Sequence, residues 1–321
     1  MARSRYPWSS SIHTAAERQY ARTVWSALDD LFDRYTRTGS AVAAATAGWR
    51  QRIYERLMSE GTTEYAWWRL DSLRRDLRSA ASAWERTVMS LGDEALEGSW
   101  ASGEGALVRG MAAAGLEPRY PHLDLPQLHL ARQHQASLIV RISADTQVKI
   151  DSLIEQMVLG EVQPQGIAVP IGRLLDTSAR ADLGSAAFQA ERVIRTEGMR
   201  VFNYANFFRG SQLAQEVPGL QKQWVHGGGG LDPRPSHRDE LHGKTIAWQD
   251  DFSVPTRQGI VKAYGPHDPN LPPDAVIHCT CTLLAVLPEW SEYNKKAGAP
   301  SRMAATRAKM QAEWVQRHRS P

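Results

Sequence analysis

Residues 275–287 have the sequence AVIHCTCTLLAVL, the clearest strand pattern in the chain. The run is apolar and partly β-branched, which predicts a buried β-strand over Ala275–Leu287. Side chains two residues apart lie on the same face of a strand, so Cys279 and Cys281 would project together. His278 would then point to the opposite face.

The segment before this strand predicts a small mixed unit. Two further strands are expected at Gln223–His226 and Lys244–Asp250. Between them lie a glycine-rich turn, GGGGLDPRP, and a short helix, SHRDELHG, which Ser236 would cap and Gly243 would end. The alternation of short strands and turns predicts an α+β domain with a short antiparallel sheet.

The rest of the chain has the three- and four-residue apolar spacing of helices. The expected helices are 17–35, 49–57, 67–91, 143–159, 171–175 and 184–215. Residues 160–170 are expected to form a loop. Tryptophans such as Trp49 and Trp84 fall on the apolar stripes, which predicts that they belong to the core.

The fold class predicted from these patterns is α+β, with a mainly helical N-terminal region and a helical C-terminal tail. The expected ranges are a helical region over 1–120, a helical connection over 121–183, the α+β domain over 184–290 and a basic tail over 291–321. The tail has seven Lys or Arg against two Glu. It is either an electrostatic arm or a solvated helix.

Composition excludes several classes of protein. The 321 residues have a net charge of only +3, which argues against a strongly basic nucleic-acid coat protein. No apolar run approaches the length that crosses a bilayer, so we expect no membrane-spanning segment. The two cysteines are one residue apart and cannot form a disulfide framework, which favours a reducing compartment or assembly inside a cell.

The cysteine pair offers two thiolates to one metal ion, and zinc is the metal expected for such ligands. We take His237 as the third ligand, because it lies in the first turn of the short helix. The residues left open as a fourth ligand are His226, His242, His267 and Asp232. A closed set of ligands would make the metal structural. The alternative is that Cys279 and Cys281 are two small buried apolar side chains.

Residues 184–215 also contain a polar row beside the apolar stripe. Thr196, Arg200, Asn203 and Phe207 follow one another at three- and four-residue steps. This row is either a solvated face or a buried hydrogen-bonding seam.

Motifs of common enzymes are missing. The Gly243-Lys244-Thr245 sequence resembles the end of a phosphate-binding loop, but Arg238 stands where that loop requires glycine. His237 and His242 are five residues apart, not the four of a metalloprotease helix, and there is no G-x-S-x-G sequence. We therefore expect no catalytic activity and name no catalytic residue.

Taken together, the motifs resemble the Mu F-type minor head proteins of tailed bacteriophages, over about residues 185–287. The elements that carry this resemblance are Arg195-Thr196-Glu197, Asn203, Trp224, Asp232, Arg234, His237, Leu241, Gly243, Cys279 and Cys281. One motif departs from the family pattern. The family usually ends this domain with Asn-Cys-Arg-Cys, whereas this chain has His278-Cys279-Thr280-Cys281. The thiolate pair survives and its polar neighbours change.

The resemblance implies a minor structural protein of the virion head, associated with the portal vertex and acting in head morphogenesis and in DNA packaging or ejection. Its expected partners are the portal protein, the major capsid protein and packaged double-stranded DNA. Its expected location is the virion, and the host cytoplasm during assembly. Two alternatives stay open. One is a DNA-binding internal head protein that relies on the basic tail, and the other is a metal-dependent toxin-like enzyme.

Overall fold

The protein is an α+β protein, as the sequence predicts. The computed structural model describes residues 15–59, 67–113, 126–159, 164–177, 184–217, 219–226 and 236–286. The long helices are α1 (Ala15–Ser59), α2 (Trp67–Ala113), α3 (Pro126–Val158), α4 (Pro164–Leu174) and α5 (Ala186–Glu216). None of the helices in these ranges is long and apolar enough to cross a membrane. The expected basic tail and glycine-rich turn lie outside the described residues.

The strands of the described residues form two small antiparallel sheets. The first sheet has the order β2-β1-β5, with β1 (Gln221–Val225) in the centre, β2 (Thr245–Ala247) on one side and β5 (Thr282–Val286) on the other. The second is a hairpin of β3 (Phe252–Thr256) and β4 (Gly259–Ala263). Two short helical turns complete this region, η1 (His237–Leu241) and α6 (Pro273–Val276).

The chain divides into two compact units, each built from segments that are separate in sequence. The sheet unit consists of the described parts of Met1–Arg34, Leu96–Leu128 and Arg195–Gln311. The helical unit consists of the described parts of Tyr35–Ala95 and His129–Ile194. The linear ranges expected from the sequence remain a prediction.

The core of the helical unit is built around tryptophan. Trp49 and Trp84 are fully buried, with ring centres 5.1 Å apart. Trp84 Nε1 donates a hydrogen bond to Thr46 Oγ1 at 2.9 Å, so its one polar atom is satisfied inside the core. The prediction that these two tryptophans are core residues is confirmed.

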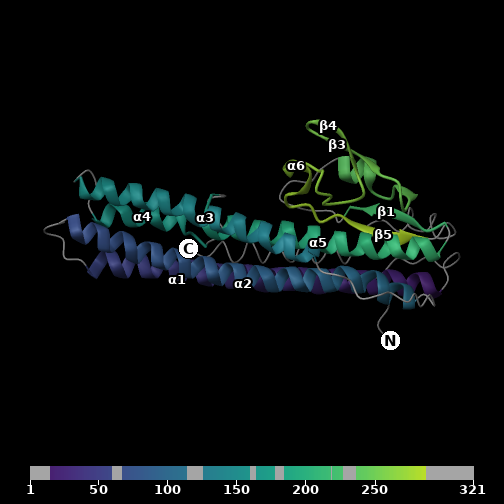
Figure 1. Ribbon diagram of the computed structural model, residues 1–321, viewed down its shortest axis with the longest axis horizontal. Coiled ribbons are helices and arrows are strands. Elements are labelled where there is room, and N and C mark those ends of the chain that lie inside the picture. The colour runs from purple at the N-terminus through teal and green to yellow at the C-terminus, as the bar shows by residue number, and fades with distance from the viewer. Residues whose placement is uncertain are drawn as a thin grey trace. The chain divides into compact units, whose positions relative to one another are not determined.

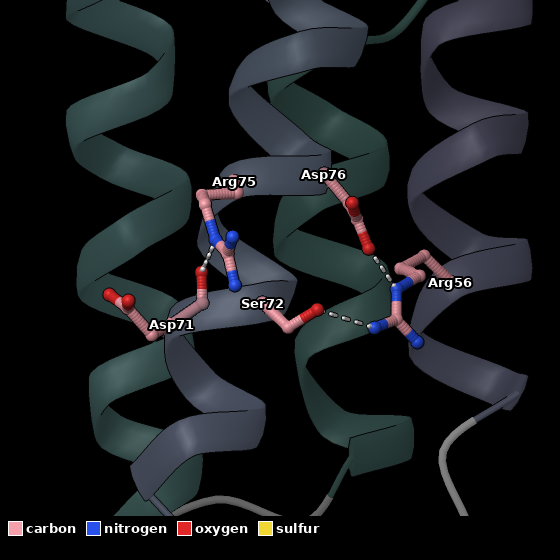
Figure 2. Close-up of polar contacts among 5 residues, drawn as sticks. All are labelled: Arg56, Asp71, Ser72, Arg75 and Asp76. Atoms are coloured by element: carbon pink, nitrogen blue, oxygen red, sulfur yellow. Dashed lines mark hydrogen bonds and ion pairs between the residues drawn. The ribbon is translucent and has the colours of Figure 1, made fainter.

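Polar contacts join α1 to α2 at the surface of the helical unit. Figure 2 shows Arg56 of α1 reaching toward α2, where its Nε donates to Asp76 Oδ2 at 2.6 Å. The same figure shows Arg75 turned back along α2 to the carbonyl oxygen of Asp71. Because the Arg56–Asp76 pair is partly exposed, it adds about 1 kcal/mol or less to stability.

In the sheet unit, side chains from helices cover the open edge of β5. Asn203 Nδ2 and Asn206 Nδ2 of α5 donate to the carbonyl oxygens of Cys281 and Leu283 at 3.1 and 3.2 Å. The amide of Ala285 donates to the hydroxyl of Tyr20 in α1 at 2.9 Å. Figure 1 shows β1 and β5 lying along α5. Two carbonyl oxygens and one amide on this edge of β5 therefore already have hydrogen-bond partners. Because these groups are occupied, another strand cannot pair with the edge.

Lys222 in β1 is a fully buried cation. Its Nζ lies 4.7 Å from the centre of the Phe207 ring and 5.8 Å from that of Phe252, and finds no hydrogen-bond acceptor in the described part of the chain. Burial lowers the pKa of Lys222 from 10.5 to about 8. The carboxylates that oppose this lowering of the pKa are those of Asp251, Asp250 and Asp268.

Several expected elements are wrong in extent. Of the described residues in the predicted strand Ala275–Leu287, those that form a strand are Thr282–Val286, and the first two belong to the helix Pro273–Val276. The predicted helices 17–35 and 49–57 are parts of one helix, α1, and α3 begins at Pro126 rather than near residue 143. The predicted loop over 160–170 contains the first residues of α4.

Two local expectations also need correction. The side chain of Ser236 makes no capping hydrogen bond, because Ser236 itself has helical dihedral angles of −60° and −37°, which do not aim its hydroxyl at the following amides. The β3–β4 hairpin was not expected from the sequence. Gly243 does end the short turn, with a φ of 80° that favours glycine.

The buried position of Lys222 predicts how stability depends on pH. The unfolded chain keeps the Lys222 proton up to higher pH than the folded chain, so the free energy of unfolding should rise by about 2–3 kcal/mol between pH ~8 and ~10.5. In Lys222→Met, which has no proton to lose, this increase in the free energy of unfolding should be absent. Urea denaturation of the wild type and of the variant at several pH values measures it. Lys244→Met, which removes an exposed lysine, is the control, and equal pH profiles for wild type and Lys222→Met would contradict the prediction.

Candidate metal centre

The first ligand of the candidate centre is His237, at the start of η1. Its side chain is buried, with 1% exposed. The Trp224 ring of β1 packs edge-on against the imidazole, with ring centres 5.3 Å apart and an angle of 73° between the planes. The position of η1 is fixed by its end, where the amide of Gly243 donates to the carbonyl oxygen of Trp224 at 2.8 Å. Trp224 thus positions both the imidazole of His237, through its ring, and the turn η1, through its carbonyl oxygen.

The two cysteines lie in the turn between α6 and β5. The turn passes through His278, whose φ is 60°, and places both thiols beside His237. Cys279 Sγ and Cys281 Sγ are each 3.6 Å from His237 Nδ1. The three ligand atoms all lie within 4.8 Å of one another, and all three side chains are buried. The structure therefore brings together the three residues that the sequence predicts as metal ligands.

The other histidines predicted as ligands have different surroundings. His226 Nδ1 lies 3.4 Å from Cys281 Sγ. His242 Nδ1 accepts a hydrogen bond from the backbone amide of His226 at 3.1 Å. His267 Nε2 lies 3.0 Å from the carbonyl oxygen of Cys279. His226 is thus close to the Cys281 thiol, and His267 is close enough to Cys279 to help lower the pKa of its thiol. The predicted ligand Asp232 lies outside the described residues.

The surroundings of Cys279 favour its thiolate form. The backbone amide of Cys281 donates to Cys279 Sγ at 3.4 Å. The hydrogen bond with the Cys281 side chain, helped by His267 and His237, lowers the pKa of the Cys279 thiol well below its ordinary value, although burial acts in the opposite direction. Because the thiolate is the form that binds a metal, these contacts prepare Cys279 as a ligand.

The polar row of α5 is a buried seam next to this centre. Thr196 and Asn203 are buried, and Asn203 Nδ2 donates both to the carbonyl oxygen of Met199 within the helix and to that of Cys281. Glu197 is buried as well and pairs with Arg200 at 2.8 Å. Of the two possibilities that the sequence leaves open, the hydrogen-bonding seam is the one observed for Asn203. The seam fixes the carbonyl of a predicted ligand, Cys281.

The arrangement has the chemistry of a metal site. Two thiols and an imidazole are soft and borderline ligands, which suit zinc better than calcium or magnesium. A group of three His, Cys, Asp or Glu side chains with ligand atoms close enough to hold an ion is found once among the described residues, and it is this one.

The contact between Asn203 and Cys281 yields a prediction for stability. Asn203→Asp replaces the donating amide with a carboxylate that faces two carbonyl oxygens, so we expect the free energy of unfolding to fall by about 2–3 kcal/mol. Gln215→Glu makes the same chemical change at an exposed position of α5 and should alter it by less than about 0.5 kcal/mol. Urea denaturation of both variants tests the contact, and a loss of similar size in the two would contradict it.

Comparisons of the chain with protein-family models, with curated proteins and with solved structures found no match in any of the three.

Proposed function

We propose that this chain is a minor structural protein of a tailed-phage head or phage-like particle, acting in head morphogenesis and in DNA packaging or ejection. One observation carries the proposal. Residues scattered over the resemblance to Mu F-type proteins meet in one place: Asn203 bonds to Cys281, and His237 contacts Trp224 and both thiols. Independent short motifs would have no reason to converge in this way.

The metal at this centre, in this proposal, is a structural zinc ion held by His237, Cys279 and Cys281. When bound, zinc supplies coordination bonds that add directly to the free energy of folding. The residues fit the ion, because the ligand atoms converge and the amide of Cys281 supports a thiolate at Cys279. Without an ion, a buried thiolate would be costly.

A structural role in the head also gives the partners of the proposal. The portal protein and the major capsid protein are the head components that such a chain would contact at the portal vertex. Packaged DNA would be a further partner if residues 291–321 act as an electrostatic arm. The alternative of a toxin-like enzyme needs an open metal position, and the burial of the ligands favours the structural reading.

The function is tested on particles. Density-purified particles from the producing strain should contain the chain at a copy number far below that of the major shell protein, as quantitative mass spectrometry would measure. Deletion of its gene should reduce the yield of DNA-filled particles. A chain absent from particles but required for their formation would support the assembly role. A chain that is both absent and dispensable would refute the proposal.

The structural zinc is tested on the purified full chain. We expect about one zinc ion per chain by elemental analysis, and a fall in Tm on the order of 5 °C or more after removal of the metal by a chelator. His237→Ala should bind less zinc and should respond less to the chelator. Asp239→Asn, at an exposed position in the same turn, should behave like the wild type. Equal zinc contents in wild type and His237→Ala would contradict the assignment.

A further inference from the structure

We infer that His226 is the fourth ligand of the metal, which makes the centre a closed site of two cysteines and two histidines. The inference rests on the structural zinc proposed above and adds a residue to its ligands. The observation that leads to it is the 3.4 Å distance between His226 Nδ1 and Cys281 Sγ.

Three of the six distances among these four ligand atoms are known, and they match edges of a tetrahedron. Zinc–sulfur bonds of about 2.3 Å and zinc–nitrogen bonds of about 2.0–2.1 Å in a tetrahedral site place sulfur and nitrogen about 3.6 Å apart. The two distances from His237 Nδ1 to the thiols are both 3.6 Å, and His226 Nδ1 lies 3.4 Å from Cys281 Sγ. Three sulfur–nitrogen separations therefore have the length that zinc coordination requires.

The backbone places His226 independently of its side chain. In the antiparallel pairing of β1 with β5, Gln221 faces Val286 and Val225 faces Thr282. The next pair in this register is His226 with Cys281, one step beyond the ladder. Residues directly opposite each other in antiparallel strands have Cβ atoms about 4.5–5.5 Å apart. The fold thus sets His226 within reach of an ion bound to Cys281.

His242 and His267 each have one ring nitrogen in another contact. His242 Nδ1 accepts the backbone amide of His226, and His267 Nε2 lies against the carbonyl oxygen of Cys279. The other nitrogen of His267, Nδ1, is buried and has no hydrogen-bond partner in the described part of the chain, so His267→Ala is tested beside His226→Ala. The charge of the centre also suits a second imidazole. Two thiolates cancel the two positive charges of zinc, so a neutral fourth ligand leaves a buried centre with no net charge, which is the least costly state to bury.

A fourth ligand at position 226 changes what the metal joins. His226 follows β1 and His237 begins η1, so the two histidines stand on either side of residues 227–235 in the sequence. Cys279 and Cys281 lead into β5. The ion would therefore fasten three segments at the end of the β1–β5 ladder, where the last registered pair is Val225 with Thr282.

The inference is tested by titrating the reduced full chain with zinc alone, in competition with a chromophoric chelator. His226→Ala should weaken zinc binding by more than about 100-fold, since even the loss of a second-shell partner costs 10–100-fold. His242→Asn is the matched control, because its Oδ1 can accept the amide of His226 as Nδ1 does. It should keep the affinity of the wild type.

A spectroscopic arm covers the case in which His226→Ala folds poorly. Cobalt(II) bound to the wild type should give the intense d–d absorption of a tetrahedral site and the charge-transfer band of two thiolates. His226→Cys should keep the tetrahedral absorption and strengthen the charge-transfer band, because a third thiolate joins the metal. An unchanged charge-transfer band in a folded His226→Cys chain would overturn the inference.

The outcomes distinguish a failure of the fourth ligand from a failure of the structural zinc proposed above. Zinc binding by the wild type with the same affinity in His226→Ala would overturn the fourth ligand and leave the other three in place. An equal loss in His226→Ala and His242→Asn would also overturn it. A wild-type chain that binds no zinc would refute the structural metal itself.

Discussion

The hydrogen bonds from α5 and α1 to the open edge of β5 are the constraint on which the sheet unit depends. Within the described residues, β5 has a strand partner on one side only, and a bare edge would leave buried carbonyls without donors. Asn203, Asn206 and Tyr20 supply the missing partners. A side-chain amide can serve one register of the strand and no other, so these contacts fix the position of β5 along the helix as well as its distance from it.

The contacts along that edge also position the ligands of the candidate metal centre. Cys281 is the residue before β5, and its carbonyl oxygen is the acceptor of the Asn203 amide. On the other strand, Trp224 holds His237 through a ring contact and holds the end of η1 through its carbonyl. The thiols and the imidazole therefore meet because two neighbouring strands each position one part of the centre. A shift of β5 by one residue would turn Cys281 to the opposite face.

Residue types predicted the site better than they predicted the fold around it. Cys279, Cys281 and His237 were recognisable from their ligand chemistry, but the predicted reason, a strand through both cysteines, was wrong because α6 and the left-handed His278 occupy that place. The β3–β4 hairpin escaped prediction because Pro255 interrupts its strand pattern. The full length of α2 escaped because glycines recur in it from Gly92 onward. Gly103 is needed there, since a Cβ atom would lie 2.2 Å from the carbonyl oxygen of Phe202. That close approach of two helices is tertiary and leaves no local pattern.

The size of the sheet explains why a metal would be useful at this position. The strands have only three to five residues, and β1 is the one strand in the first sheet with a strand partner on both sides. Such a short ladder gains little from each pair and frays at its ends. The ladder stops at Val225 and Thr282, and the next opposed residues are His226 and Cys281. Coordination bonds at that point would replace the hydrogen bonds of a longer ladder, and they would bind η1 to the same end. The ion would then stabilise the sheet unit where its backbone pairing is weakest.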